Sequence, residues 1–215
     1  MDLLKVDYQI SYVNIIFLIL GIDLSVLAFD ASEKQRKSAE AIATCVKKLV
    51  KYLLNYPKIL VAAVNGIAQG LGVTLLPYFD IIFASDKATF SLSTYAKLGQ
   101  VPEGFASHTF PSSNHRVFNE MLLLGKTITA SEAKEIGLVS SVIWPDKFLE
   151  SIIPQMELLE RIPAEGLKIV HGYIKVQLNT NILEEETKEL IKSWTTTNFP
   201  KKVRQFIKLN NISFQ

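Results

Sequence analysis

Short runs of consecutive apolar residues alternate with a segment of helical periodicity in the first part of the chain. The runs at 12–20, 58–66 and 80–92 are rich in β-branched and aromatic residues, which predicts buried strands. A turn interrupts the third run and leaves a short extra strand after it. Between the first two runs, apolar residues recur every three or four positions over 32–55, which predicts a helix that ends before Pro57. This alternation indicates an α/β domain.

The predicted helix at 32–55 has one apolar face and one polar face that is directed toward solvent. Lys47, Lys48 and Lys51 fall on the wet side, where we expect a solvated face. Cys45 lies near the apolar side and is expected in the core. As the one cysteine of the chain, it excludes an intrachain disulfide and gives no zinc-binding spacing.

Helical patterns dominate the chain from residue 115 onward. In the segment 129–137, Thr129 and Glu132 form a capping-box pattern, and Gly137 stands where a left-handed terminator belongs. A short strand follows in "LVSSVIW". Three more helices are predicted near 164–177, 181–197 and 200–209.

Composition narrows the class of protein. No repeat, linker or low-complexity segment divides the 215 residues, so we expect one domain over 1–215, with a core over 1–145 and a helical part over 146–215. The net charge of +2, with dispersed lysines, argues against a nucleic-acid partner. The three histidines show no metal-binding spacing, and no metal site is predicted.

Residues 9–29 form the most hydrophobic stretch, and its length approaches that of a membrane span. Asn14, Gly21 and Asp23 interrupt the stretch, and no Lys or Arg cluster borders it. We therefore expect a buried strand followed by a turn, and no membrane span.

Two glycine turns follow predicted strands. Gly70-Leu71 opens a short helix after the second apolar run, and Gly21-Ile22 follows the first. A turn at the start of a helix leaves backbone N–H groups free to bind an anion or a developing oxyanion. The spacing fits neither a dinucleotide fingerprint nor a P-loop, and the same pattern is typical of a tight structural turn.

Glu103 stands between a proline and a glycine in the apolar and hydroxylic stretch "VPEGFASHTF". A carboxylate in an apolar pocket has a raised pKa and suits proton abstraction, so Glu103 is a candidate catalytic base. The alternative is an acid that only favours the start of a helix after a proline.

Three segments together resemble the enoyl-CoA hydratase/isomerase (crotonase) superfamily, and within it the Δ3,Δ2-enoyl-CoA isomerases. They read "ILVAAVNGIAQGLGVTLLPYFDIIFASDKATF", "LGQVPEG" and "LLLGKTITASEAKEIGLVSSV", and the likeness is strongest over 56–145. The resemblance implies an α/β crotonase-like fold, a spiral of ββα units with a helical C-terminal region. It also implies assembly as a homotrimer.

The resemblance also implies roles for particular positions. The backbone N–H groups of Ile22 and Leu71, after Gly21 and Gly70, would form an oxyanion hole for a thioester, and Glu103 would be the catalytic base. The implied activity is that of an enoyl-CoA isomerase in β-oxidation, which moves a double bond of an unsaturated fatty acyl-CoA. One base takes a proton from C2 and returns it to C4. No cofactor is needed beyond the coenzyme A of the substrate, and a peroxisomal or mitochondrial location is implied.

Departures from the family pattern leave alternatives open. The positions of the two hydratase glutamates hold Thr74 and Thr94, which disfavours a hydratase. The segment before Gly21 is shorter than in the family and matches it poorly. A non-catalytic acyl-CoA-binding or scaffold protein with a decayed site is therefore the alternative. A hydrolase or hydratase would need another carboxylate, for which Asp23 and Asp80 are the nearest candidates.

Overall fold

Two small sheets form the centre of the protein. The structure is a computed structural model that describes residues 13–17, 22–28, 32–110, 115–174 and 180–209. In that part of the chain, a parallel sheet has the order β1 (Val13–Phe17), β2 (Ile59–Val64), β4 (Ile81–Ser85), β7 (Ser141–Ile143). The second sheet has the order β3 (Ile67–Gln69), β5 (Thr89–Ser91), β6 (Thr127–Thr129), with β5 and β6 antiparallel.

The chain alternates between the two sheets. β2 and β3 precede the short helix α2 (Leu71–Thr74), and β4 and β5 precede α3 (Ser93–Leu98). Each unit thus gives one strand to each sheet and then a helix, which is the ββα order that the resemblance implies. The predicted α/β class is confirmed.

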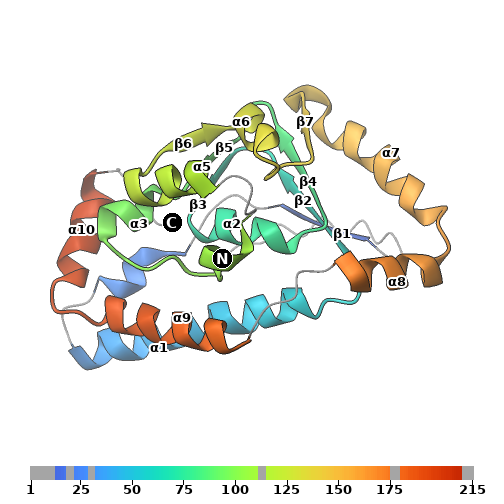
Figure 1. Ribbon diagram of the computed structural model, residues 1–215. Coiled ribbons are helices and arrows are strands. Elements are labelled where there is room, and N and C mark those ends of the chain that lie inside the picture. The colour runs from blue at the N-terminus through green and yellow to red at the C-terminus, as the bar shows by residue number, and fades with distance from the viewer. Residues whose placement is uncertain (1–12, 18–21, 29–31, 111–114, 175–179, 210–215) are drawn as a thin grey trace.

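Longer helices surround the sheets (Figure 1). α1 (Ser32–Leu54) lies alongside α9 (Thr180–Trp194), while α10 (Phe199–Leu209) lies at one end of the molecule and α7 (Phe148–Glu160) and α8 (Ala164–Ile174) at the other. The remaining helices are α4 (Ala106–Thr109), α5 (His115–Asn119), a π-helical turn at Glu120–Leu124, and α6 (Ala130–Glu135).

Strand β2 is an unbroken apolar run because both of its faces are buried. Leu60, Ala62 and Val64 belong to the main core cluster, which includes residues of α1. Val61 and Ala63 point the other way, into a cluster with residues of α7. Alternate side chains therefore meet helices on opposite faces, as in other parallel sheets.

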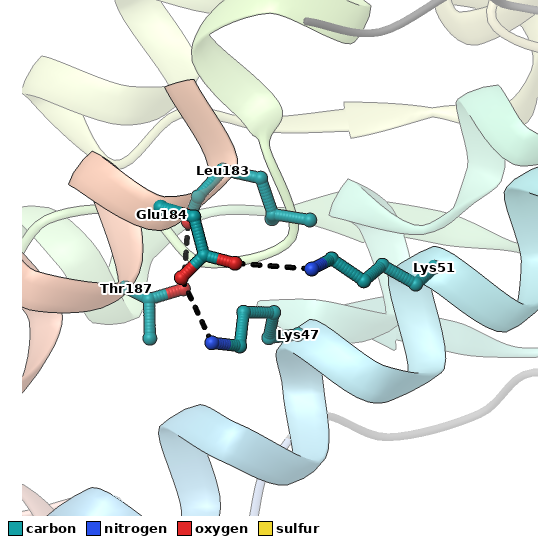
Figure 2. A network of polar contacts seen from close by, with 5 residues as sticks. All are labelled: Lys47, Lys51, Leu183, Glu184 and Thr187. Atoms are coloured by element: carbon teal, nitrogen blue, oxygen red, sulfur yellow. Dashed lines mark hydrogen bonds and ion pairs between the residues drawn. The ribbon is translucent and has the colours of Figure 1, made fainter. Parts of the chain in front are cut away.

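One acidic side chain ties α9 to α1. Figure 2 shows Lys47 and Lys51 of α1 reaching the carboxylate of Glu184, with Nζ–O distances of 2.9 and 3.0 Å. The expectation of a merely solvated lysine face is therefore wrong for these two residues, whereas Lys48 is exposed. Because the pairs are partly exposed, they align the two helices more than they stabilise the fold.

Several local predictions can be compared with the structure. The capping box of Thr129 and Glu132 is confirmed, and Gly137 has a φ of +76°. The prediction for Cys45 is wrong, because Ala43 and Val46 turn inward and leave Cys45 exposed on the other side of α1. Among the described helices, none is both long and apolar enough to cross a bilayer.

A buried polar contact fastens α8 to the start of β4. His171 Nε2 lies 3.1 Å from Asp80 Oδ1, with side-chain exposures of 8% and 13%. The second oxygen of Asp80 accepts a hydrogen bond from the Leu60 N–H at 2.7 Å. Asp80 therefore joins β2, β4 and α8. His171 gives its other carboxylate oxygen a partner.

Replacing His171 by alanine should lower the free energy of unfolding by about 1–3 kcal/mol, because a buried carboxylate oxygen of Asp80 loses its partner. Urea denaturation measures the change. The control is Tyr173→Ala, on the same helix but 85% exposed, which should change stability by less than about 0.5 kcal/mol. Equal effects of the two substitutions would contradict a fastening role for His171.

Candidate active site

Glu103 lies in the turn between α3 and α4 and is 2% exposed. The helix α4 begins only at Ala106, so Glu103 is outside its first turn. The reading of Glu103 as a helix-start acid is therefore wrong. Its hydrogen-bond donor is the side chain of Gln100, with Nε2 3.4 Å from Oε2.

The carboxylate of Glu103 faces the turn at Gly70. A side-chain carbon built on Gly70 would lie 3.8 Å from Oε1 of Glu103 and 3.8 Å from the Tyr95 hydroxyl oxygen. Gly70 itself has φ +55° and ψ −123°, a conformation that L side chains rarely adopt. A glycine here therefore gives the turn its shape and lets the acid lie against its backbone.

Leu71 follows Gly70 as the first residue of α2 and is buried. The Gly70 carbonyl accepts hydrogen bonds from the N–H groups of Val73 and Thr74, which closes the turn. The Leu71 N–H stands at the start of the helix, where backbone donors have no intrahelical acceptor. It is thus a candidate donor to an oxygen bound near Glu103.

The second predicted donor, Ile22, is half-buried and packs against the core cluster that contains Leu71. Gly21 lies outside the described residues. Because β1 and β2 are adjacent and parallel, the segments that follow them leave the same edge of the sheet. Convergence of the N–H groups of Ile22 and Leu71 on one point stays a prediction.

Burial controls the acidity of Glu103. Loss of water raises its pKa from 4.5 to about 7, while the Tyr95 hydroxyl and a backbone N–H act in the opposite direction. A carboxyl group of this pKa exchanges protons near neutral pH. It is therefore suited to take a proton from carbon and to return it.

Tyr95 places a hydroxyl beside Glu103 and Thr74. The residue is 3% exposed, and no residue in the described ranges gives this hydroxyl a well-formed hydrogen bond. Burial, followed by the charge of Glu103, raises its pKa well above the usual value, so it stays protonated. The hydroxyl is thus a protonated donor beside Glu103, and it acts to lower the pKa of that acid.

A second buried carboxylate comes from the far end of the chain. Glu186 on α9 is 8% exposed and accepts a hydrogen bond from the Phe105 N–H at 2.7 Å. Burial raises its pKa to about 7, and the charge of Glu103 adds to the rise. Sequence reasoning missed it, although its spacing from Leu183 and Leu190 puts an acid on the apolar face of the helix.

Two successive side-chain hydrogen bonds also link α9 to Glu103. Trp194 Nε1 donates to Gln100 Oε1 at 3.0 Å, which fixes the amide so that its N–H₂ faces Glu103. Gln35 of α1 in turn donates to the Trp194 carbonyl at 2.7 Å. Gln100 and Trp194 were not singled out from the sequence, because an isolated amide or indole carries no pattern of its own.

The other acids considered from the sequence take no part in this group. Asp23 caps a 3₁₀ turn by accepting from the Ser25 N–H at 2.9 Å, and Asp80 is bonded to His171. Both are therefore engaged elsewhere, and the second buried carboxylate near Glu103 is that of Glu186. No cluster of metal-binding side chains is found within the residues described.

Thr74 and Thr94 are the residues that the family resemblance places at the hydratase glutamate positions. Thr74 is fully buried, and its hydroxyl donates to the Leu71 carbonyl at 3.3 Å. Thr94 accepts from Gln69 Nε2 at 3.3 Å. Both hydroxyls serve the local hydrogen bonding of the turn region, and neither supplies a group that titrates near neutral pH.

A separate hollow of about 250 Å³ lies between α1 and the 3₁₀ turn at Leu76–Tyr78. Its lining comprises Leu53, Leu54, Pro77, Tyr78, Phe79, Asp80 and Ile174. It does not include Glu103, and its one acid is already bonded to His171. The hollow is therefore separate from the buried group around Glu103.

Known proteins resemble this chain over most of its length. It is 35% identical over 182 residues to human Chromodomain Y-like protein 2, covering 82% of this chain and 36% of that protein. It is 33% identical over 195 residues to Enoyl-CoA delta isomerase 3, peroxisomal, from Mus musculus, covering 87% of this chain and 60% of the relative. The chain thus spans less than two thirds of the length of either relative.

A solved structure shows the same fold. An enoyl-CoA hydratase from Mycobacterium avium subsp. paratuberculosis K-10 matches with a TM-score of 0.71 at 21% identity, over 89% of this chain and 94% of that one. The family model described as Enoyl-CoA hydratase/isomerase matches residues 19–205. Because this match covers most of the chain, including strands β2 to β7, the turn at Gly70 and the buried acid, the chain belongs to the enoyl-CoA hydratase/isomerase family.

Proposed function

We propose that this protein is an enoyl-CoA isomerase that moves the double bond of an unsaturated fatty acyl-CoA from C3–C4 to C2–C3. The observation that carries the proposal is the carboxylate of Glu103, buried against the turn at Gly70 with a pKa of about 7. Similarity to an enoyl-CoA delta isomerase supports the class of reaction.

The proposed reaction needs one base and one site for negative charge. The thioester oxygen would accept hydrogen bonds from the N–H groups of Ile22 and Leu71, each worth about 3–4 kcal/mol as charge develops on it. Ionised Glu103 takes a proton from C2, and the electron pair moves to the thioester oxygen as an enolate. When the enolate collapses, the double bond shifts and Glu103 returns the proton to C4.

Addition of water is disfavoured by the side chains around the base. A hydratase would need a second acid or base to act on water, and Thr74 and Thr94 cannot titrate near neutral pH. Glu186 is bonded to the Phe105 N–H. Of the two buried acids, Glu103 lies against the turn at Gly70 whereas Glu186 holds the Phe105 N–H, so one carboxylate beside the proposed oxyanion donor fits double-bond migration better than hydration.

Partners and location are proposed from family resemblance. The substrate supplies its own coenzyme A, and the proposed steps use no other cofactor. A homotrimer in the peroxisome or mitochondrion is the proposed state, and the name of the mouse relative includes the word peroxisomal.

A non-catalytic acyl-CoA-binding protein or scaffold is the second candidate. Its support is the 35% identity to Chromodomain Y-like protein 2, a relative whose name states no reaction. On this alternative the protein would bind an acyl-CoA without converting it. Turnover and binding measured on the same preparation separate the two.

The purified protein should convert a 3-enoyl-CoA to the 2-trans isomer, followed by the absorbance of the conjugated thioester. Glu103→Gln should lower kcat by about 10²–10⁴-fold, because the amide cannot accept the C2 proton. The control Glu120→Gln changes an exposed acid paired with Lys126 and should leave kcat unchanged. Undiminished turnover by Glu103→Gln would remove Glu103 as the base, and acyl-CoA binding without wild-type turnover would favour the scaffold.

The pH dependence of the free energy of unfolding should reveal the buried Glu103 without any measurement of turnover. Because the folded-state pKa of Glu103 is raised from 4.5 to about 7, folding favours its protonated form. The free energy of unfolding should therefore fall as pH rises from 4.5 to 7, by up to about 3 kcal/mol relative to Glu103→Gln. Urea unfolding of both proteins at pH 4.5 and pH 8 measures this difference, and parallel pH profiles would show that Glu103 is not buried in solution.

A further inference from the structure

Helix α9 holds the segment that carries Glu103 at both ends. Glu186 accepts from the Phe105 N–H, and Trp194 donates to the side chain of Gln100. Residues 186 and 194 are about 12 Å apart along the helix axis. One rigid helix from the C-terminal region therefore spans the turn on which the candidate base stands.

The turn held by Glu186 has an unfavourable backbone. Gly104 has φ +78° and Phe105 has φ +63°, the one positive φ of a non-glycine residue in the described part of the chain. A side-chain carbon at Gly104 would lie 2.8 Å from the Thr74 hydroxyl, and the Tyr78 hydroxyl donates to the Gly104 carbonyl at 2.8 Å. A strained turn persists only where its surroundings hold it in place.

The packing of α9 does not explain a carboxylate at position 186. Leu183 and Leu190, on the same face, are 2% exposed and lie in apolar clusters. The second oxygen of Glu186 has no hydrogen-bond partner among the residues described. An aliphatic side chain would bury this face without stranding a charge, so the acid must serve something other than packing.

The groups that face Glu186 are acidic or neutral. They are Glu103 from the turn, Tyr78 from the 3₁₀ turn and Tyr95 from α3. The lysines of α1 bind its neighbour Glu184 instead. Among the residues described, no cation pairs with Glu186; the charge of Glu103 raises the pKa of Glu186, and since this repulsion is mutual, ionised Glu186 disfavours ionisation of Glu103.

We propose that Glu186 is a positioning residue for Glu103: its hydrogen bond to the Phe105 N–H holds the Gly104–Phe105 turn, and its charge sets the proton affinity of Glu103. The inference rests on the proposed function, in which Glu103 is the base. It adds a residue from α9, 83 positions away in the sequence, to the control of that base.

Three variants separate the hydrogen bond from the charge. Glu186→Gln keeps an acceptor oxygen for the Phe105 N–H but removes the charge, and Glu186→Ala removes both. Glu189→Gln is the matched control, an exposed acid one turn further along α9 that pairs with Lys192. Each variant is measured for kcat and KM on a 3-enoyl-CoA between pH 5 and 9, and for amide hydrogen exchange of Phe105 by NMR.

For Glu186→Gln we expect Phe105 to stay protected from exchange and the acidic limb of kcat/KM to move to lower pH, since loss of a nearby negative charge favours ionised Glu103. For Glu186→Ala we expect faster exchange at Phe105 and a fall in kcat of about 10²-fold with KM nearly unchanged, because the base is misplaced. Glu189→Gln should match the wild type in every measurement.

A wild-type pH profile for Glu186→Gln, or wild-type kcat for folded Glu186→Ala, would overturn the proposal. If Glu186→Ala does not fold, the profile of Glu186→Gln decides alone. If the wild-type protein shows no turnover, the proposed function itself is contradicted. In that case the Phe105 exchange and a ¹³C titration of the Glu103 carboxyl, each compared between wild type and Glu186→Gln, still test the positioning role.

Discussion

The enclosure of the Glu103 carboxylate beside the backbone of Gly70 is the constraint on which the rest of the site depends. At 2% exposure the acid has lost its water, so its charged form is costly, and its protons exchange near neutral pH. The turn opposite it needs a glycine, because Gly70 has a φ of +55° that L side chains rarely adopt. A flat, solvated loop would have left Glu103 an ordinary acid.

The two layers of the fold bring the parts of this site together from distant stretches. The sheets fix the turn at Gly70, since Gly70 N–H donates to the Ser91 carbonyl of β5 at 3.0 Å. Helix α9 is aligned on α1 through Glu184 (Figure 2). It fixes the segment from Gln100 to Phe105 through Trp194 and Glu186. The proposed base and its proposed donor are thus positioned by separate elements, each with its own hydrogen bonds.

The strongest features of the fold were predictable because they depend on local sequence. Strands buried on both faces leave unbroken apolar runs, and the capping box from Thr129 to Glu132 is a four-residue pattern. The three-residue strands β3 and β6 carry too few side chains to show a period. Glu103 was recognisable from its flanking residues, whereas Glu186 stands in an acid-rich helix where the spacing from the buried leucines alone marks it, and the turn it contacts becomes visible in the structure.

Phe105 combines two requirements that few residues meet together. Its backbone lies in the left-handed region, which favours glycine or asparagine, yet its ring is 1% exposed within the main core cluster. Glycine would relax the backbone but empty the core, whereas valine or isoleucine would fill space at a higher steric cost. Few residue types can therefore replace Phe105. The geometry of the turn that carries Glu103 depends on the shape of this aromatic ring.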